Sequence, residues 1–260
     1  MIKFLLISLL CIFPQIITAQ TKLSDWAVEA ESTESKVSLT SDGSIDIIAP
    51  KGLTLWYKRQ MQGNVIIEYD AQIVVEEHNN NTWNRLSDLN CFWQATDPKQ
   101  KDGSVLRGIP KRKGIFANQY ALSLYYMGYG GNYNSTTRFR RYNGNENGVK
   151  DPSFRPAILR EYTDPGHILK PNHWYHIRLE QHFGHVRYII DGECIVDYLD
   201  IRPFYRGYFG FRTTLAHAQI RNFIYSETPV SGTPVSLHWV GRKPNSSASP
   251  QTFGIPFLQG

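Results

Sequence analysis

The sequence predicts an all-β protein with the architecture of a β-sandwich, and three observations support this class. Several segments alternate apolar and polar residues, which is the pattern of a strand with one face in a core. Turns rich in Gly, Asp and Asn separate these segments at the short spacing typical of sandwiches. In addition, no window of about 12 residues combines a helical period with capping residues at its ends.

The clearest expected strand covers residues 64–75, which read NVIIEYDAQIVV. Its apolar face holds Ile67, Tyr69, Ala71 and Ile73, and its polar face holds Glu68, Asp70 and Gln72. Glu68 and Asp70 are two residues apart along a strand, which separates them by roughly 6 to 7 Å. A retaining glycosidase needs two carboxylates ~5 to 5.5 Å apart. The alternative, a charged outer face or a hydrogen-bonding groove floor, is the reading that we favour.

A second expected strand lies within residues 87–97, SDLNCFWQATD. We expect its core side to hold Leu89, Cys91 and Trp93. Its other side then presents Asp88, Asn90 and Gln94, whose polar groups suit sugar hydroxyls. The alternative is a partly buried strand that ends where Asp97 caps a turn before Pro98. The basic, turn-rich residues 97–118 that follow are expected to form a long loop.

Residues 119–127 are the next expected strand, and residues 128–142 then read GYGGNYNSTTRFRRY. Alternation places Arg138, Arg140 and Tyr142 on one face of a strand, with Phe139 and Arg141 on the other. A guanidinium group matches a carboxylate in bidentate geometry, and aromatic faces stack on sugar rings. Two arginines on one face repel each other unless an anion lies between them. The alternative is an exposed strand whose charges are merely solvated.

The C-terminal half of the domain reads as further strands. Residues 173–200 turn near Phe183-Gly184 and again near Asp191-Gly192, and residues 207–214 and 218–227 look like closing strands. Within the first of these strands, one face carries Tyr175, Ile177 and Leu179, and the other carries Trp174, His176 and Arg178. The predicted domain therefore spans residues 20–227.

The two ends of the chain differ from the domain. Residues 1–19 have a basic start, an apolar run and a small-residue exit, which predicts a secretory signal peptide and a periplasmic or secreted protein. A lipoprotein anchor at Cys11 is the less favoured alternative, because Leu10 stands where a small residue is expected. No later stretch approaches the ~18 apolar residues of a membrane span. Residues 228–260 combine a Pro/Ser-rich linker with an apolar fragment that reads as the truncated start of a second module.

The charge and the cysteines set weaker limits. Removal of Lys3 with the signal peptide lowers the formal net charge from +5 to +4, an excess that suits an anionic ligand without requiring one. Cys91 and Cys194 remain. They pair in a disulfide or stay as two buried thiols, and the sequence leaves both open.

Four segments together resemble a known family. They are LSDLNCFWQATDP, GYGGNYNSTTRFRRY, KPNHWYHIRLEQHFGHVRYIIDGECIVDY and GYFGFRTT. Over roughly residues 25–227 the chain resembles secreted bacterial YesU-like proteins associated with rhamnogalacturonan utilisation. The resemblance implies a concanavalin-like jelly-roll β-sandwich and a carbohydrate context. The tail TFGIPFLQG resembles the start of a YetA-like exo-rhamnogalacturonan lyase domain, which implies a downstream lyase-like module.

The candidate chemistry follows from these residues. A β-elimination lyase needs a group that neutralises the uronate carboxylate and a base that removes the C5 proton. The candidate catalytic residues are Tyr142, His173 and His176. The candidate substrate-binding residues are Arg138, Arg140, Glu68, Asp70, Asn90, Gln94, Tyr133 and Tyr162. We expect these side chains to gather from several strands into one positively charged trough lined with rings.

Three rivals to the lyase remain open. A glycoside hydrolase would use Glu68 and Asp70, since EYDAQ resembles the E-x-D-x-E signature of concanavalin-like endoglucanases. However, Gln72 replaces that family's second glutamate. A non-catalytic carbohydrate-binding module and a structural sandwich are the other two.

The expected partner is an acidic polysaccharide or oligosaccharide. Nucleic acid is disfavoured because the chain is exported and acidic residues share its polar faces. The sequence contains no H-E-x-x-H, C-x-x-C or EF-hand motif, so we expect no metal site and no cofactor. A structural calcium, as some sandwiches carry, has no location in the sequence.

Overall fold

The computed structural model describes residues 15–18 and 22–230. Most of the predicted signal peptide, and all of the 228–260 tail except its first three residues, lie outside the described residues. The predictions of a leader and of a second module therefore stay predictions.

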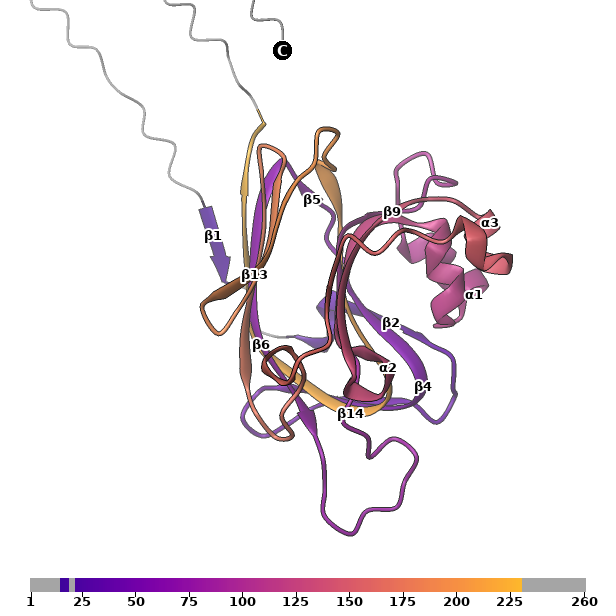
Figure 1. Cartoon of the computed structure of the whole chain (residues 1–260), viewed down its shortest axis with the longest axis vertical. Helices are drawn as coiled ribbons and strands as arrows, with labels where there is room; N and C mark the ends of the chain where they lie inside the picture. The colour runs from indigo at the N-terminus through magenta and orange to yellow at the C-terminus, as the bar shows by residue number, and fades with distance from the viewer. Residues whose placement is uncertain (1–14, 19–21, 231–260) are drawn as a thin grey trace, which may run out of the picture. The chain divides into compact units, whose positions relative to one another are not determined.

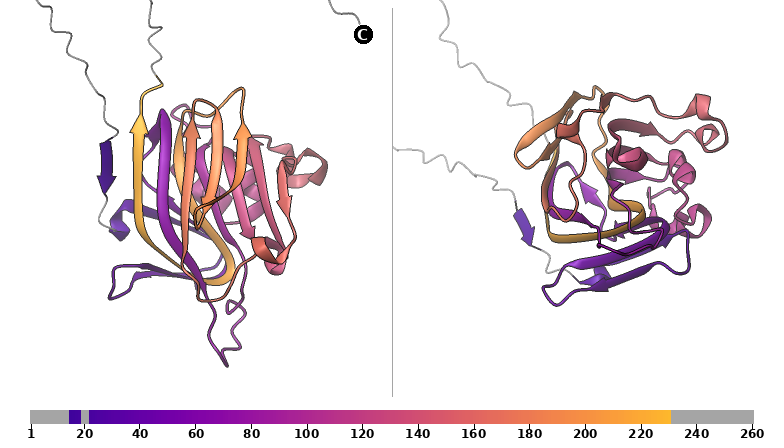
Figure 2. Two further views of the ribbon diagram at one scale, coloured as in Figure 1. Left: turned by 60° about the vertical axis from the view of Figure 1, so that its left-hand side comes forward. Right: turned by 60° about the horizontal axis from the view of Figure 1, so that its bottom comes forward.

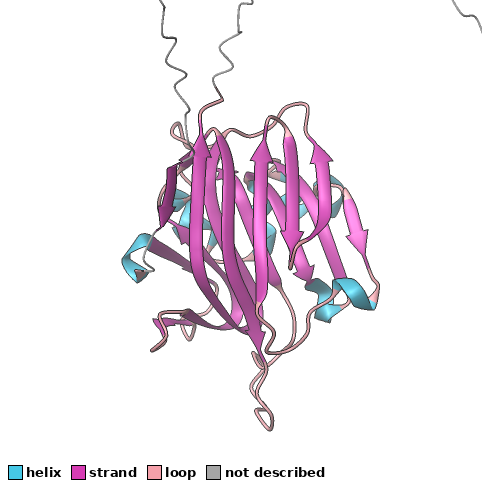
Figure 3. Ribbon diagram, turned by 90° about the vertical axis from the view of Figure 1, so that its left-hand side faces the viewer, coloured by secondary structure: helices cyan, strands magenta, loops and turns pink. Residues whose placement is uncertain are grey.

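Antiparallel strands form two layers that share the long strand β14 (Arg206–Thr228). The first layer continues from β14 through β7 (Leu89–Thr96), β8 (Ser123–Gly130), β9 (Thr136–Asn143) and β10 (Arg160–Tyr162). The second continues through β6 (Asn64–Val74), β11 (Tyr175–His182), β12 (His185–Ile190) and β13 (Glu193–Leu199). Figure 1 shows the layers edge-on, with β6 and β13 in one and β9 in the other, and Figure 3 shows the second layer face-on.

The remaining strands pair around β14. β4 (Ile45–Tyr57) pairs with its middle, and β2 (Trp26–Ala30) and β3 (Lys36–Leu39) pair with β4. Two short strands, β1 (Gln15–Thr18) and β5 (Met61–Gln62), pair with the ends of β14. Figure 2 shows how β14 bends from one layer into the other. The prediction of an all-β sandwich is therefore confirmed.

The helices are short and lie outside the strands. The short helical segments are α1 (Ile109–Arg112), α2 (Gly131–Asn134) and α3 (Asn147–Lys150), and α2 is a turn because Asn132 and Tyr133 have left-handed dihedrals. The 3-10 turns are η1 (Leu23–Asp25), η2 (Leu106–Gly108), η3 (Phe116–Ala121), η4 (Pro152–Phe154) and η5 (Pro165–His167).

The main core lies between the two layers, and the strands enter it as alternation predicts. β6 contributes Ile67, Tyr69, Ala71 and Ile73, all of them buried. β11 contributes Tyr175, Ile177 and Leu179, and β7 contributes Leu89, Cys91 and Trp93. Each large apolar side chain buried in this way contributes about 1.5 to 3 kcal/mol. The outward residues of the same strands are therefore free to form surfaces.

A second apolar cluster covers the outer face of the first layer, where we predicted only a long loop. Residues 97–118 instead fold into η2, α1 and the start of η3, and Figure 1 shows α1 and α3 on this side. Val105, Ile109 and Phe116 from this segment pack against Trp56 and Phe92 from the sheet. The loop prediction missed these short helical turns, because the spaced apolar residues give the segment a face to bury.

A buried carboxylate holds this covering segment in place. Glu29 is 0% exposed and accepts four hydrogen bonds through its two oxygens. The donors are Trp56 Nε1 at 2.8 Å, Arg112 Nη2 at 2.7 Å, Gly114 N at 3.2 Å and Gln119 Nε2 at 2.7 Å. Three of these donors belong to residues 112–119. One carboxylate from β2 thus fixes the segment that walls the cavity described next.

Candidate functional site

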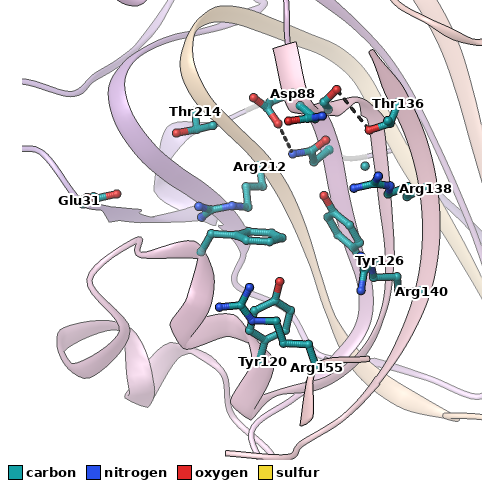
Figure 4. A pocket seen from close by; sticks show the side chains of 15 residues that line it. Glu31, Asp88, Tyr120, Tyr126, Thr136, Arg138, Arg140, Arg155, Arg212 and Thr214 are labelled. Carbon is teal, nitrogen blue, oxygen red and sulfur yellow. Dashed lines mark hydrogen bonds between the residues drawn. The ribbon is translucent and has the colours of Figure 1, made fainter. Parts of the chain in front are cut away.

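A pocket of about 430 Å³ opens on the outer face of the first layer (Figure 4). Four arginines line it: Arg138, Arg140, Arg155 and Arg212. Three aromatic side chains line it as well: Phe116, Tyr120 and Tyr126. The arginines come from β9, from the segment after η4 and from β14, and Figure 4 shows their side chains around one cavity. Two carboxylates, Glu31 and Asp88, line it too, so the pocket combines an excess of positive charge with ring surfaces.

Arg212 is the most deeply placed cation of the pocket, with 2% of its surface exposed. Its Nη1 donates to Thr54 Oγ1 and to the Gly114 carbonyl, each at 3.0 Å, and its guanidinium carbon lies 5.1 Å from the centre of the Phe116 ring. Among the described residues, no carboxylate forms an ion pair with it. Burial lowers the pKa of Arg212, and the more distant Glu29 only partly opposes this effect. A desolvated charge without a counter-ion is costly, so the site favours an anion.

The other arginines stand around the opening and already have partners. Arg138 Nε lies 2.6 Å from Glu161 Oε1 in an ion pair that is about one-third exposed. Arg140 donates to the Pro156 carbonyl. Arg155 is exposed and its guanidinium carbon lies 5.1 Å from the centre of the Tyr120 ring. These groups can reorient towards a ligand more easily than Arg212.

Two polar residues of β7 and the turn before it form the end of the pocket near α2. Asp88 adopts a left-handed backbone conformation with φ of 67°. Its Oδ2 accepts from Arg85 Nη2 at 2.7 Å and from Ser87 Oγ at 2.8 Å, and its Oδ1 accepts from Asn90 Nδ2 at 3.2 Å. Asn90 Oδ1 is buried and has no hydrogen-bond partner within the described part of the chain. Asp88 already pairs with Arg85 and forms no ion pair with Arg212, so its charge opposes the burial of Arg212 only from a distance.

Tyr126 places its hydroxyl in the pocket between Arg212 on one side and Arg138 with Arg140 on the other (Figure 4). The hydroxyl fits because Gly128 has no side chain, since a Cβ there would lie 2.3 Å from Tyr126 Oη. Burial and, after it, the charge of Asp88 raise the pKa of Tyr126 well above its ordinary value, and Arg212 and Arg140 only partly offset this. The group therefore stays protonated at neutral pH and acts as a hydrogen-bond donor.

Alternation predicted which residues of β7 and β9 share a face. Arg138, Arg140 and Asn90 line the pocket together. Arg141 points to the other face of β9, where its Nε lies 2.6 Å from Asp200 Oδ2. Burial raises the pKa of Asp200, but the hydrogen bonds from Arg141, Arg202 and Tyr125 outweigh burial and lower it overall.

Tyr142 faces the same side as the arginines but does not reach the pocket. The ring is fully buried in the second apolar cluster against Tyr120 and Tyr126, and its hydroxyl has no hydrogen-bond partner in the described chain. Tyr120, from η3, packs against it. Of the tyrosines in this strand pair, Tyr126 presents its hydroxyl to the cavity instead.

The prediction of a single trough that includes Glu68, Asp70 and His176 was wrong. These side chains lie on the outer face of the second layer, so the main core separates them from the pocket. His176 Nδ1 lies 2.9 Å from Asp70 Oδ1, and Arg178 forms an ion pair with Glu68. Arg221 Nε also lies 3.5 Å from Asp70 Oδ2, so each carboxylate has an arginine partner, which suits a charged outer face better than an acid–base pair.

Four further candidates also lie away from the pocket lining. His173 is exposed, with Nε2 3.2 Å from Asp191 Oδ2. Gln94 is buried and donates to the Gly63 carbonyl at 3.3 Å. Tyr162 packs against the main core, and its hydroxyl donates to the Ile195 carbonyl at 2.7 Å. Tyr133 is 75% exposed beside the pocket residue Asn132.

Cys91 and Cys194 are free thiols, so the disulfide alternative is wrong. Cys91 is buried in the main core, and burial raises its pKa to about 12. Cys194 is exposed, which corrects the expectation of two buried thiols. Among residues 15–18 and 22–230, no group of three His, Cys, Asp or Glu side chains is placed to hold a metal ion. Within the same residues, no helix is long and apolar enough to cross a membrane.

Solved structures of related shape define the class of this fold. A protein of unknown function with a galectin-like fold from Bacillus subtilis superimposes with a TM-score of 0.58 at 16% identity, over 84% of this chain and 96% of that chain. The exoplasmic/lumenal domain of VIP36, bound to Ca²⁺ and Man3GlcNAc, gives 0.52 at 15% identity, over 82% and 88%. The potassium-bound carbohydrate recognition domain of Emp46p gives 0.51 at 12% identity, over 80% and 91%. The fold is thus a jelly-roll β-sandwich of the galectin-like and concanavalin-like type, as predicted.

The sequence also places the chain in a family. Residues 47–223 match the model described as "Domain of unknown function (DUF6250)", and the chain belongs to this family. No curated protein matches the chain. The matched residues include every arginine of the pocket.

Proposed function

We propose that this protein binds an acidic oligosaccharide in the arginine pocket, with a uronate carboxylate against Arg212. The observation that carries the proposal is the buried guanidinium of Arg212, which has no ion-pair partner among the described residues. A carboxylate at this point would supply the missing counter-ion and accept charge-assisted hydrogen bonds. The resemblance of the sequence to YesU-like proteins supports a pectic, rhamnogalacturonan-type ligand and an exported protein.

The rest of the pocket suits a sugar rather than a small inorganic anion. Its volume of about 430 Å³ lies within the range of small-molecule sites. Phe116, Tyr120 and Tyr126 offer ring surfaces, and the Tyr126 hydroxyl and Asn90 amide offer polar groups for sugar hydroxyls. The glycan-bound VIP36 domain shows that the same fold holds sugars in another protein.

Isothermal titration with a galacturonate oligosaccharide and its carboxyl-reduced counterpart tests the proposal. The wild type should bind the acidic ligand and lose most affinity for the neutral one. Arg212→Gln should weaken acidic binding by about 10- to 100-fold, since a hydrogen bond to a charged group contributes about 1.5 to 3 kcal/mol. Arg187→Gln, on the outer face of the second layer, is the matched control and should bind as the wild type does. The proposal would be contradicted if the wild type bound both ligands with equal affinity. It would also be contradicted if Arg212→Gln bound the acidic ligand as tightly as Arg187→Gln.

A second candidate function, β-elimination, is favoured by one observation: the Tyr126 hydroxyl shares the pocket with the arginines. Arginine would neutralise the uronate carboxylate. Tyr126 would take the C5 proton and pass it to the glycosidic oxygen as the C4–O bond breaks and the C4–C5 double bond forms. The raised pKa of Tyr126 favours donation over abstraction, which supports binding as the leading proposal. Ultraviolet absorbance of an unsaturated uronate product, on incubation with the same oligosaccharide, would reveal elimination.

A further inference from the structure

The turn beside the pocket, labelled α2, has an unusual backbone conformation. Asn132, Tyr133 and Asn134 are consecutive non-glycine residues with positive φ, at 50°, 59° and 56°. For an L-residue the left-handed conformation costs about 1 to 2 kcal/mol. Such a segment persists only where its surroundings determine it, and these segments are common at ligand sites. The side chain in the middle, Tyr133, contributes little to folding because 75% of it is exposed.

Hydrogen bonds from both ends hold this turn rigidly. The Asn134 side chain donates through Nδ2 to the Leu169 carbonyl at 2.9 Å and accepts through Oδ1 from the Leu169 amide at 2.7 Å. The Ser135 amide donates to the Gly131 carbonyl at 3.0 Å, and Ser135 Oγ donates to the Asn132 carbonyl at 2.6 Å. The exposed ring is therefore presented from a fixed backbone.

The ring of Tyr133 is also connected to the pocket through Arg85. The Arg85 guanidinium carbon lies 4.7 Å from the ring centre. The same guanidinium donates to Asp88 Oδ2 at 2.7 Å and to the Thr214 carbonyl at 2.9 Å, and both of these residues line the pocket. One face of the ring thus rests on an anchored cation at the edge of the pocket, and most of the remaining ring surface meets solvent.

We infer that Tyr133 forms a second sugar subsite beside the arginine pocket, and this inference rests on the proposed function. The ring would stack on the sugar linked to the uronate that Arg212 holds. An aromatic face carries partial negative charge, so it attracts the C–H groups of a sugar and disfavours a carboxylate. The matching ligand is a disaccharide or longer chain in which an uncharged sugar follows the acidic one.

Titrations with two probes test the subsite: methyl galacturonoside, and the disaccharide of galacturonate linked to rhamnose. Tyr133→Ala should lower the affinity for the disaccharide by about 3- to 10-fold, since an aromatic contact contributes about 0.5 to 1.5 kcal/mol. It should leave the affinity for the monosaccharide unchanged. Tyr133→Phe should bind both as the wild type does. Tyr133→Gly, which tolerates the positive φ, should reproduce the alanine result without backbone strain.

Phe183 is the matched control, because it is a similarly exposed ring (55%) at the turn between β11 and β12. Phe183→Ala should change neither affinity. An unchanged disaccharide affinity in Tyr133→Ala, alongside a loss in Arg212→Gln, would overturn the subsite and leave the proposed function standing. Equal losses for both probes would also overturn it, because Tyr133 would then act on the pocket through Arg85. If the wild type bound neither probe, the proposed function would fall and the subsite with it.

Discussion

Replacement of Glu29 by alanine should destabilise the protein severely, because its carboxylate accepts three hydrogen bonds from residues 112–119 of the segment that covers the sheet. It is 0% exposed, and its loss would leave the guanidinium of Arg112, itself 5% exposed, with only the longer contact of 3.7 Å to Asp97 Oδ2 as an ion pair. The Trp56 indole N–H and the Gln119 amide would lose their acceptor as well. Removal of one partner of a buried pair costs about 3 to 5 kcal/mol. For a domain of this size that corresponds to a fall in Tm of about 6 to 20 °C.

Urea unfolding followed by tryptophan fluorescence measures this loss as a shift in the midpoint at constant slope. Glu161→Ala is the matched control, because Glu161 forms an ion pair of similar length with Arg138 but is 37% exposed at its side chain. An exposed pair contributes at most about 1 kcal/mol, so the control should barely move the midpoint. Similar small shifts in both variants would refute the reasoning that the buried carboxylate fixes the segment.

Three further predictions concern single groups. Asp200 has a lowered pKa, so its ionised form stabilises the fold above the unfolded pKa of about 3.9 and this contribution is lost as pH falls through the folded value. Asp200→Asn should therefore lower the free energy of unfolding at pH 7, and the difference from the wild type should shrink in acid titrations as pH falls through the folded pKa. Tyr126→Phe should weaken binding of the galacturonate oligosaccharide about 2- to 10-fold in titration calorimetry, whereas Tyr142→Phe, whose hydroxyl is buried, should not. Thiol labelling should modify Cys194 in the native protein and Cys91 only after unfolding, and a native Cys91 signal would contradict its burial.

The sequence predicts the fold well because period-two alternation determines which side of a strand is buried. In the strands within residues 64–75 and 87–97, the side chains that we predicted for the core are buried there. The same rule placed Arg138 and Arg140 on an outer face. This rule depends only on the alternation of side chains along an extended chain.

Alternation does not reveal which of the two outer faces a side chain occupies. Glu68 and Arg138 are both outward residues, yet they belong to different layers, and only the long-range pairing around β14 decides this. The predicted trough therefore merged two separate surfaces. The prediction that Tyr142 lines the site failed for a related reason. A segment distant in sequence covers its ring, and no local pattern shows that.

The sequence analysis did not select Arg212, although strand alternation predicts the direction of its side chain. In GYFGFRTT, the side chains of Phe209 and Phe211 enter the core. Alternation therefore places Arg212, the residue after Phe211, on the outer face of the strand, the face that also carries Gly210. The strand alone cannot indicate that the arginine is buried there without a counter-ion. That property depends on the covering segment, whose Phe116 and Gly114 close over it.

A crystal structure of the protein with a galacturonate-containing oligosaccharide tests the central claim most directly. We expect a uronate carboxylate oxygen within about 3.2 Å of an Arg212 nitrogen, with a sugar ring beside Tyr126. A ligand bound instead on the outer face of the second layer, near Glu68 and His176, would contradict the account. A pocket that stays empty at saturating ligand would contradict it equally.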